Sequence, residues 1–347
     1  MTPESPRPSA ACTEGGSAPG EAAAFGMPVA EPARPSTLPA TASPPAAAAP
    51  TVSVVIASHG AASVLPECLA ALGAAAGSRA IEIIVAHSSA DRPPEDLQHR
   101  FPGIRWLDGG GRPTIPQLRG AGIAASHGAI IAVVDPYCLV DGHWLEELIR
   151  IHGTRPEPAV GGAVVMDAAE ANLASWAMYF SEYAAFTPPL DEGPSVELTG
   201  NNISYKRRAL GDVAAMERAG FWKAFFNRRL QADGHQLWTA PSIVVRLRKP
   251  VPFREFLRSR YHHGRCFAAM RVAGTPWYVK GWRAGTAPIV PLVALGRQAR
   301  HLWPKGQYRT KFLLCLPLLL LLHGTWAVGE WWGYTRGSGR SCDELTF

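Results

Sequence analysis

The first residue that could do chemistry is Asp135, which stands at the end of an apolar run. Residues 130–134 read IIAVV, Pro136 follows the carboxylate, and a helix-like run begins at Trp144. Such a run has the length and composition of a buried strand, and Pro136 would stop it from continuing in the centre of a sheet. Ligands bind at the carboxyl ends of strands in open α/β sheets. Asp135 is therefore predicted to contact a ligand, the alternative being that it caps a turn.

Two further stretches carry polar groups that regular structure does not require. Gly200, Asn201 and Asn202 stand inside a predicted strand at residues 198–205. All three are poor strand formers, so they indicate either close approach of a ligand or a β-bulge without one. The predicted helix at residues 253–271 is strongly basic. Such a helix is typical of a solvated face, a lipid-facing surface or a phosphate site.

Alternating strands and helices must position these groups. Strand, helix and strand in succession, joined by short turns, predict a parallel doubly wound sheet. The turn after the first strand, residues 57–63, reads ASHGAAS and is not a GxGxxG loop, which argues against an ordinary NAD or FAD domain. The strands are predicted at residues 52–57, 81–86, 105–107, 130–134, 160–165, 198–205 and 238–246.

Composition restricts the class of partner. The chain has 347 residues, of which 47% are hydrophobic, and a formal charge of +6. Its basic residues gather between residues 246 and 311, next to the most apolar segment. This placement favours anionic lipid or phosphate-bearing ligands, and no nucleic-acid partner is expected because no DNA- or RNA-binding signature accompanies it.

The cysteines and the first fifty residues carry no site of their own. The six cysteines are scattered without metal-ligand spacing. We therefore expect neither a thiolate metal site nor a disulfide framework, and a reducing compartment fits. Residues 1–50 are rich in Ala, Pro, Ser and Gly, so they are expected to be disordered and to contain no secretory signal.

One segment approaches the length of a bilayer span. Residues 312–328 read FLLCLPLLLLLHGTWAV, and the aromatic residues that follow extend the segment to residue 334. Cations at Lys305, Arg309 and Lys311 precede it, so the positive-inside rule places the preceding domain in the cytoplasm. A buried core helix is the alternative.

A weaker apolar run lies at residues 287–295 and is too short to span. It is expected to lie in the membrane interface, with Arg297 and Arg300 at the level of the headgroups. A hairpin of two membrane helices is the alternative, but it would place both arginines in lipid at considerable cost.

Five motifs between residues 51 and 271 together resemble the catalytic domain of glycosyltransferase family 2. In order they read VSVVIASHG, IEIIVAHSSAD, LRGAGIAASHGAIIAVVD, TGNNISYKRRAL and RLQADGHQLW. The resemblance implies an α/β GT-A fold, the Rossmann-like fold of nucleotide-diphospho-sugar transferases, followed by a C-terminal membrane-associated helical segment. It also implies a nucleotide-sugar donor, usually with Mg²⁺ or Mn²⁺, and inversion at the anomeric carbon.

The resemblance assigns most candidate residues to the nucleotide sugar. Asp135 matches the first Asp of the family's Asp-x-Asp motif and would hold the metal, but Tyr137 stands where the second Asp is expected. His87 likewise replaces an Asp, and Gly120 replaces the Asn that usually follows Arg119. The residues expected to bind the nucleotide sugar are Ser58, His59, His87, Ser89, Asp91, Arg119, Asp135 and Tyr137.

The remaining assignments concern the acceptor, the diphosphate and the catalytic carboxylate. The resemblance places Gly200, Asn201 and Asn202 beneath the acceptor, and Arg260, His263 and Arg265 over the diphosphate. An inverting transfer needs a carboxylate that takes the proton of the acceptor hydroxyl. The acidic pair that usually supplies it is missing from residues 220–227. The catalytic candidates are then Asp135, Glu217 and Asp191, with Glu192 beside the last.

These inferences predict a membrane-attached hexosyltransferase. Its partners would be a nucleotide-diphosphate sugar, a lipid-linked or polysaccharide acceptor and membrane lipids, and it would act at the cytoplasmic face of the cell membrane. The alternative is a catalytically inactive homologue that binds nucleotide sugar or a partner enzyme. The predicted parts are a tail at 1–50, a GT-A domain at 51–271, a basic linker at 272–311, a membrane helix at 312–334 and a tail at 335–347.

Overall fold

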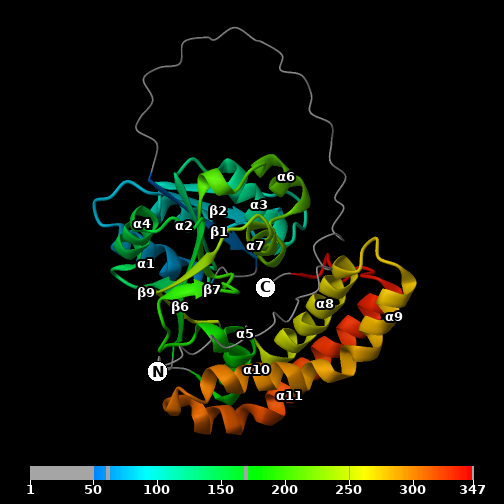
Figure 1. Ribbon diagram of the computed structural model, residues 1–347. Helices are drawn as coiled ribbons and strands as arrows, with labels where there is room; N and C mark the ends of the chain where they lie inside the picture. The colour runs from blue at the N-terminus through cyan, green and yellow to red at the C-terminus, as the bar shows by residue number, and fades with distance from the viewer. Residues whose placement is uncertain (1–50, 60–62, 168–170, 250, 346–347) are drawn as a thin grey trace, which may run out of the picture.

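A computed structural model describes residues 51–59, 63–167, 171–249 and 251–345. The predicted disordered tail at residues 1–50 lies outside the described residues. The described chain forms an α/β domain, and a block of C-terminal helices lies to one side of it (Figure 1).

A single mixed sheet forms the centre of the α/β domain. Its strands follow the order β3-β2-β1-β4-β8-β6-β9-β5, and β7 pairs with β9. The strands are β1 (Val52–Ser58), β2 (Glu82–His87), β3 (Ile104–Asp108), β4 (Ile130–Val134), β5 (Cys138–Val140), β6 (Ala159–Met166), β7 (Gly193–Ser195), β8 (Asn202–Lys206) and β9 (Leu237–Leu247).

Helices cover the sheet and form the C-terminal block. They are α1 (Leu65–Ala76), α2 (Glu95–Arg100), α3 (Ile115–Ala125), α4 (Trp144–Thr154), α5 (Leu173–Tyr183), α6 (Val213–Ala219), α7 (Lys223–Ala232), α8 (Phe253–Arg271), α9 (Trp277–Thr286), α10 (Val290–Leu302) and α11 (Arg309–Arg336).

The sheet is parallel from β1 to β4 and mixed beyond them, where β6 and β9 pair in parallel. Strands β1 to β4 are parallel neighbours, as predicted. Strand β8 runs antiparallel to both β4 and β6, and β5 and β7 run antiparallel to β9. The prediction of a parallel sheet is therefore correct for β1 to β4 and for the pair β6 and β9, and wrong for the pairings of β5, β7 and β8. Periodicity identifies strands, but it does not state which strands pair after long connections.

Two apolar cores lie on the two faces of the sheet. Strand β1 contributes to both, because successive side chains of a strand point to opposite faces. Val54 and Ile56 belong to the larger core, which α1, α4 and α5 complete. Val55 belongs to the smaller core with Ile123 of α3. The sheet is thus covered on both faces. The carboxyl ends of β1, β2 and β4 meet at one edge because these strands are parallel neighbours.

The C-terminal block consists of α9, α10 and α11 (Figure 1). Helix α11 packs against α8 and α5, and α9 and α10 pack against α11. By length and composition, residues 306–336 could cross a membrane, and 39% of their most apolar window is buried inside the protein. The predicted interfacial run at residues 287–295 forms a short 3₁₀ turn and the start of α10.

One disulfide joins α8 to the chain after α11. It links Cys266 to Cys342, 76 residues apart, so the expectation that these cysteines stay unpaired is wrong. Sequence spacing did not indicate this pairing, because α11 must first return the chain alongside α8. The scattered cysteines therefore no longer support a reducing compartment.

A buried histidine makes stability depend on pH. His152 of α4 is hydrogen-bonded through Nε2 to the Ser204 hydroxyl, at 2.7 Å. Burial, aided by the charge of Lys206, lowers the pKa of His152 to about 3. In the unfolded chain the pKa of this histidine is about 6.5. At mildly acidic pH the unfolded chain therefore binds a proton there, whereas His152 stays neutral in the folded chain.

We expect wild-type protein to lose stability between pH 7 and pH 4.5, and His152→Gln to lose about 2–3 kcal/mol less over that interval. Glutamine can keep the hydrogen bond to Ser204 but does not titrate. Urea unfolding at the two pH values measures the difference. The control is His143→Gln, because the side chain of His143 is 83% exposed. An equal loss in wild type and His152→Gln would contradict the assignment.

Candidate functional site

The first part of the site lies where β1 and β2 end. Ser58 and His87 are paired residues at the ends of these parallel strands, and both side chains are buried. His59 follows Ser58, and its Nε2 lies 3.5 Å from a carboxylate oxygen of Asp91. The hydroxyl of Ser89 donates to Asp108 at 2.8 Å. The residues predicted to bind the nucleotide therefore gather at one edge of the sheet.

An ion pair between Arg119 and Asp135 forms the second part. Arg119 lies on α3, Asp135 directly follows β4, and Nη2 is 2.5 Å from Oδ1. The side chain of Asp135 thus binds Arg119 and does not cap a turn. The Nε of Arg119 is buried without a hydrogen-bond partner among the described residues. A buried donor without a partner is costly, so it indicates a place for a ligand oxygen.

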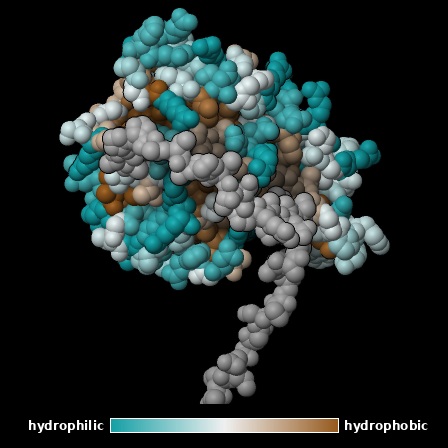
Figure 2. All heavy atoms as spheres, turned by 90° about the horizontal axis from the view of Figure 1, so that it is seen from above, coloured by the Kyte–Doolittle hydropathy of each residue, from teal (hydrophilic) through white to brown (hydrophobic). Residues whose placement is uncertain are grey.

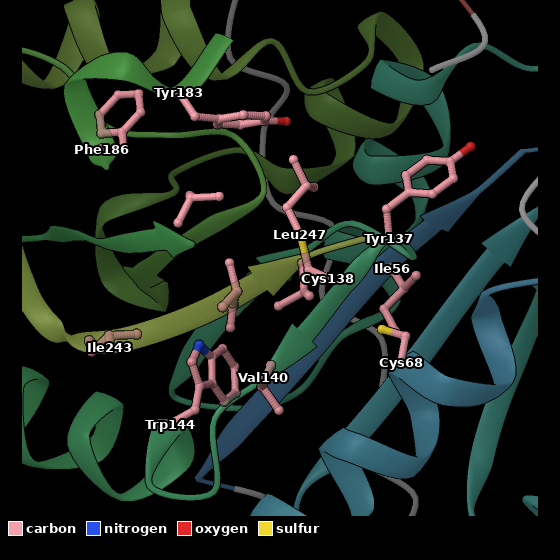
Figure 3. Close-up of a cluster of buried hydrophobic side chains, with 14 of the residues drawn as sticks. Ile56, Cys68, Tyr137, Cys138, Val140, Trp144, Tyr183, Phe186, Ile243 and Leu247 are labelled. Atoms are coloured by element: carbon pink, nitrogen blue, oxygen red, sulfur yellow. The ribbon is translucent and has the colours of Figure 1, made fainter. Parts of the chain in front are cut away.

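Tyr137 lies next to this pair and is buried. Burial, with the charges of Asp135 and Asp91, raises the pKa of Tyr137 to about 12. The phenol therefore stays neutral at physiological pH and cannot replace the missing carboxylate. Figure 3 shows Tyr137 and Tyr183 of α5 on either side of Leu247, at the edge of the apolar core.

Glu182 of α5 is the second carboxylate of the site. Its oxygens lie 3.5 Å from Nζ of Lys249 and 3.6 Å from Nη1 of Arg260. Burial alone would raise the pKa of Glu182, but the charges of Lys249, Arg260 and His263 outweigh burial and hold this pKa below its usual range. Burial, then the charge of Arg260, lowers the pKa of His263 to about 4, so this imidazole is neutral at pH 7.

Lys223 of α7 lies on another side of the same site. Its Nζ donates to the Leu198 carbonyl at 2.7 Å. A Cβ on Gly200 would lie 3.9 Å from both Arg119 and Lys223, so Gly200 borders the site without filling it. We call Asp135, Glu182, Arg119, Lys223, Lys249 and Arg260 the charged cluster.

The two asparagines predicted beneath the acceptor are held inside the protein. Asn202 accepts from the Trp144 indole and donates to the carbonyls of Ala163 and Ile243, at 2.8–3.0 Å. Asn201 is buried as well, and its amide bonds the sulfur of Cys138 at 3.3 Å. Of the three residues predicted there, only Gly200 borders the charged cluster.

The other predicted residues lie in several places. Arg260 and His263 of α8 reach the cluster, but Nε of Arg265 donates to the carbonyl of Gly337 at 3.0 Å. Glu217 is exposed on α6, and among the described residues it makes no ion pair or hydrogen bond with the cluster. The charge of Asp191 acts on Lys305, near the start of α11.

The side chains of the site do not form a protein-built divalent metal site. Among the described residues, no group of three His, Cys, Asp or Glu side chains is placed to hold a metal. Asp135 is the carboxylate next to the residues that were predicted to bind the nucleotide, and its Oδ1 already binds Arg119. Magnesium and manganese prefer several oxygen ligands. This donor set fits such an ion poorly.

Comparison with known proteins adds the family. Residues 53–213 match the family model described as Glycosyl transferase family 2. This part of the chain is a glycosyl transferase family 2 domain. The match contains Asp135, Arg119 and Glu182, whereas Lys223, Lys249 and Arg260 follow it in the chain. The predicted family and the predicted GT-A fold are both confirmed.

Solved structures resemble the domain at low identity. Residues 1–349 of S. aureus TarS are 10% identical over 83% of this chain and 92% of that one, with a TM-score of 0.43. The mannosyltransferase PcManGT from Pyrobaculum calidifontis, in complex with GDP-Man and Mn²⁺, is 15% identical over 82% and 88%, with a TM-score of 0.49. No curated protein matches the chain in sequence.

Sequence reasoning missed three members of the charged cluster. Glu182 stands in the apolar aromatic run LASWAMYFSEY, where a lone carboxylate was the available signal. An acid in an apolar run is rarely buried unless it is paired, so a cationic partner for Glu182 could have been predicted. No comparable signal marked Lys223 or Lys249, because a single lysine in a polar stretch is ordinary.

We expect Glu182→Gln to lower the free energy of unfolding by about 2–4 kcal/mol, because the partly buried guanidinium of Arg260 would lose the charge of Glu182. Denaturant unfolding at pH 7 measures this change. The matched control is Glu192→Gln, which removes an exposed ion pair with Arg155 and should cost less than about 1 kcal/mol. Equal effects of the two substitutions would show that the cluster is solvated.

Proposed function

We propose that the protein is an inverting hexosyltransferase that moves a sugar from a nucleoside-diphosphate sugar to a lipid-linked or polysaccharide acceptor. The glycosyl transferase family 2 domain supports the class of donor. The charged cluster is the observation that carries the proposal, because it places two carboxylates and several cations near the carboxyl ends of the strands.

The cations of the cluster would stabilise the leaving diphosphate. The cluster brings four cations together with two carboxylates, and Glu197 lies 3.7 Å from Lys223 at its rim. Besides Arg119, Arg260 has a buried Nε without a partner among the described residues. Guanidinium donors of this kind suit phosphate oxygens, and they are most effective where water is excluded.

Glu182 is our proposal for the group that accepts the proton of the acceptor hydroxyl. It is ionised at neutral pH and belongs to the cluster, whereas Glu217 and Asp191 do not contact it. As the hydroxyl oxygen attacks the anomeric carbon, the proton would pass to Glu182, and the diphosphate would leave with the bonding electrons. Asp135 would hold Arg119 and orient the donor.

A divalent cation, expected from the family resemblance, would find one protein oxygen here, Oδ2 of Asp135. If it is bound, it supplies positive charge at the diphosphate. The cations of the cluster reduce the need for it.

The C-terminal half supports the proposed acceptor and location. The apolar helix α11 and the basic residues beside it support a membrane-bound acceptor. If α11 crosses the membrane, the cations before it place the catalytic domain in the cytoplasm by the positive-inside rule. The divisions at residues 51–271, 272–311 and 312–334 remain our proposal for the functional parts.

A second candidate function is nucleotide-sugar binding without turnover. The observation that favours it is the ion pair between Asp135 and Arg119, which occupies a carboxylate oxygen that a metal would otherwise use.

Purified protein in detergent should release nucleoside diphosphate from one of a panel of radiolabelled nucleotide sugars. Asp135→Ala should reduce this release at least about 100-fold, because Arg119 loses its partner at the donor. The matched control is Glu146→Ala, which removes an exposed carboxylate on α4 and should leave release unchanged.

Replacing Mn²⁺ by EDTA in the same assay should preserve most of the release. Complete loss with EDTA, restored by Mn²⁺, would make Asp135 a metal ligand and contradict the cation-based proposal. Binding of a nucleotide sugar without release would support the second candidate function.

The rate of release should be nearly constant between about pH 6 and 8, because neither Glu182 nor His263 changes protonation there. Glu182 has a lowered pKa, so the rate should fall only on the acid side, below the ordinary glutamate pKa of about 4.3. Glu182→Gln should reduce the rate at least about 100-fold throughout this range without a comparable rise in KM. A titration centred near pH 6.5 would identify a different base.

A further inference from the structure

The exposed apolar side chains of the protein are concentrated on the C-terminal block. Of the large apolar side chains that are exposed among the described residues, all but Leu173 and Val196 lie between Trp277 and Trp331. In Figure 2, which looks down on the α/β domain, hydrophilic residues are widespread and apolar ones form separate small areas. The exposed apolar residues of the block are Trp277, Tyr278, Trp282, Ile289, Leu292, Val293, Trp303, Leu313, Leu314, Leu320, Leu321, Val328 and Trp331.

The opposite face of α11 packs against the rest of the protein. A Cβ on Gly329 or Gly333 would lie 2.3 Å from a backbone carbonyl oxygen of α8, and one on Gly264 of α8 would lie 2.4 Å from the Trp326 carbonyl. These two helices therefore touch backbone to backbone, as small residues at a helix interface permit.

Two buried polar pairs fix α11 further. His323 lies 2.8 Å from the amide nitrogen of Gln298 on α10, and Glu330 lies 3.2 Å from Arg271 on α8. These polar groups are satisfied only while α11 stays against the protein, since lipid offers them no partner.

Both ends of α11 are attached to the α/β domain. At its start, Nζ of Lys311 lies 4.1 Å from the centre of the Trp176 ring on α5. After its end, Cys342 is bonded to Cys266, and the Leu345 carbonyl accepts from the amide of Ile115, the first residue of α3. A spanning helix must place its two ends about 30 Å apart across hydrocarbon. Helix α11 cannot do so while both ends contact the same domain.

The charge of the block suits an anionic surface. Residues 272–336 contain eight Lys and Arg residues and a single acid, Glu330, which is buried against Arg271. Arg297, Arg300 and Arg309 are exposed beside the apolar residues of α10 and α11. Tryptophan at the rim of an apolar face, with flanking cations, is typical of helices that lie in a membrane interface.

We propose that α9, α10 and α11 form a monotopic surface that enters one leaflet of an anionic bilayer, with α11 lying along the membrane and not crossing it. The apolar faces would enter the acyl boundary, and the cations would contact lipid phosphates. The proposal replaces the predicted membrane-spanning helix at residues 312–334. It deepens the proposed function and rests on it only where it brings the charged cluster close to a lipid-linked acceptor.

Flotation of the full chain with vesicles tests the surface. The protein should float with phosphatidylcholine vesicles that contain phosphatidylglycerol, and less with phosphatidylcholine alone. The variant Trp277→Ser/Trp282→Ser/Leu292→Ser should lower the bound fraction at least about tenfold, because each changed side chain is more than two-thirds exposed apolar surface. The matched control is Val196→Ser, 88% exposed but outside the block, and it should float like wild type.

Labelling of a cysteine at the end of α11 tests its orientation. In a Cys12→Ser background, Arg336→Cys should react with a membrane-impermeant maleimide on sealed vesicles as completely as Glu95→Cys on α2. Protection of Arg336→Cys until detergent is added would show that α11 crosses the bilayer, and would overturn the proposal.

Two other results would also overturn it. Undiminished flotation of the triple variant would place the lipid contact elsewhere. A stable dimer in aqueous buffer that does not float would assign the apolar faces to a second copy of the chain. Neither measurement needs turnover, so loss of glycosyl transfer with normal flotation would reject the proposed function alone.

Discussion

The close packing of α8 against α11 is the contact on which the arrangement of the molecule depends. Helix α8 supplies Arg260 to the charged cluster on one side and Gly264 to the interface with α11 on the other. The guanidinium of Arg260 also lies 4.2 Å from the centre of the Trp326 ring on α11. One rigid helix therefore sets the distance between the charged cluster and the exposed apolar faces.

Local sequence patterns predicted the helices and strands well where an apolar pattern is bounded by a clear turn or helix start. The predicted helix at residues 253–271 coincides with α8, because Pro252 stands before it and its apolar residues recur at helical spacing. Strands β1, β2 and β4 are buried apolar runs bounded by turns, and they were predicted within one or two residues. The antiparallel pairings of β5, β7 and β8 were missed, because pairing across long connections leaves no local signature.

The site residues likewise divide into those with a local sequence signal and those that tertiary packing brings together. Asp135 and Arg119 were both predicted, since each stands at a recognisable end of a strand or on a helix of the repeated pattern, and the structure brings them into contact. Glu182 and Lys249 were not predicted, because they come from elements 67 residues apart that tertiary packing alone brings together. Asn202 was predicted to contact a ligand, but its side chain forms hydrogen bonds inside the protein core instead.

The position of α5 bears on how the protein folds during synthesis. Phe180 of α5 packs against Phe312 of α11. One aromatic face of the α/β domain therefore stays uncovered until a residue 132 positions later has been synthesised. At about 5–20 residues per second, the ribosome takes roughly ten seconds to supply it. During that time the nascent domain exposes an aromatic face next to its charged cluster.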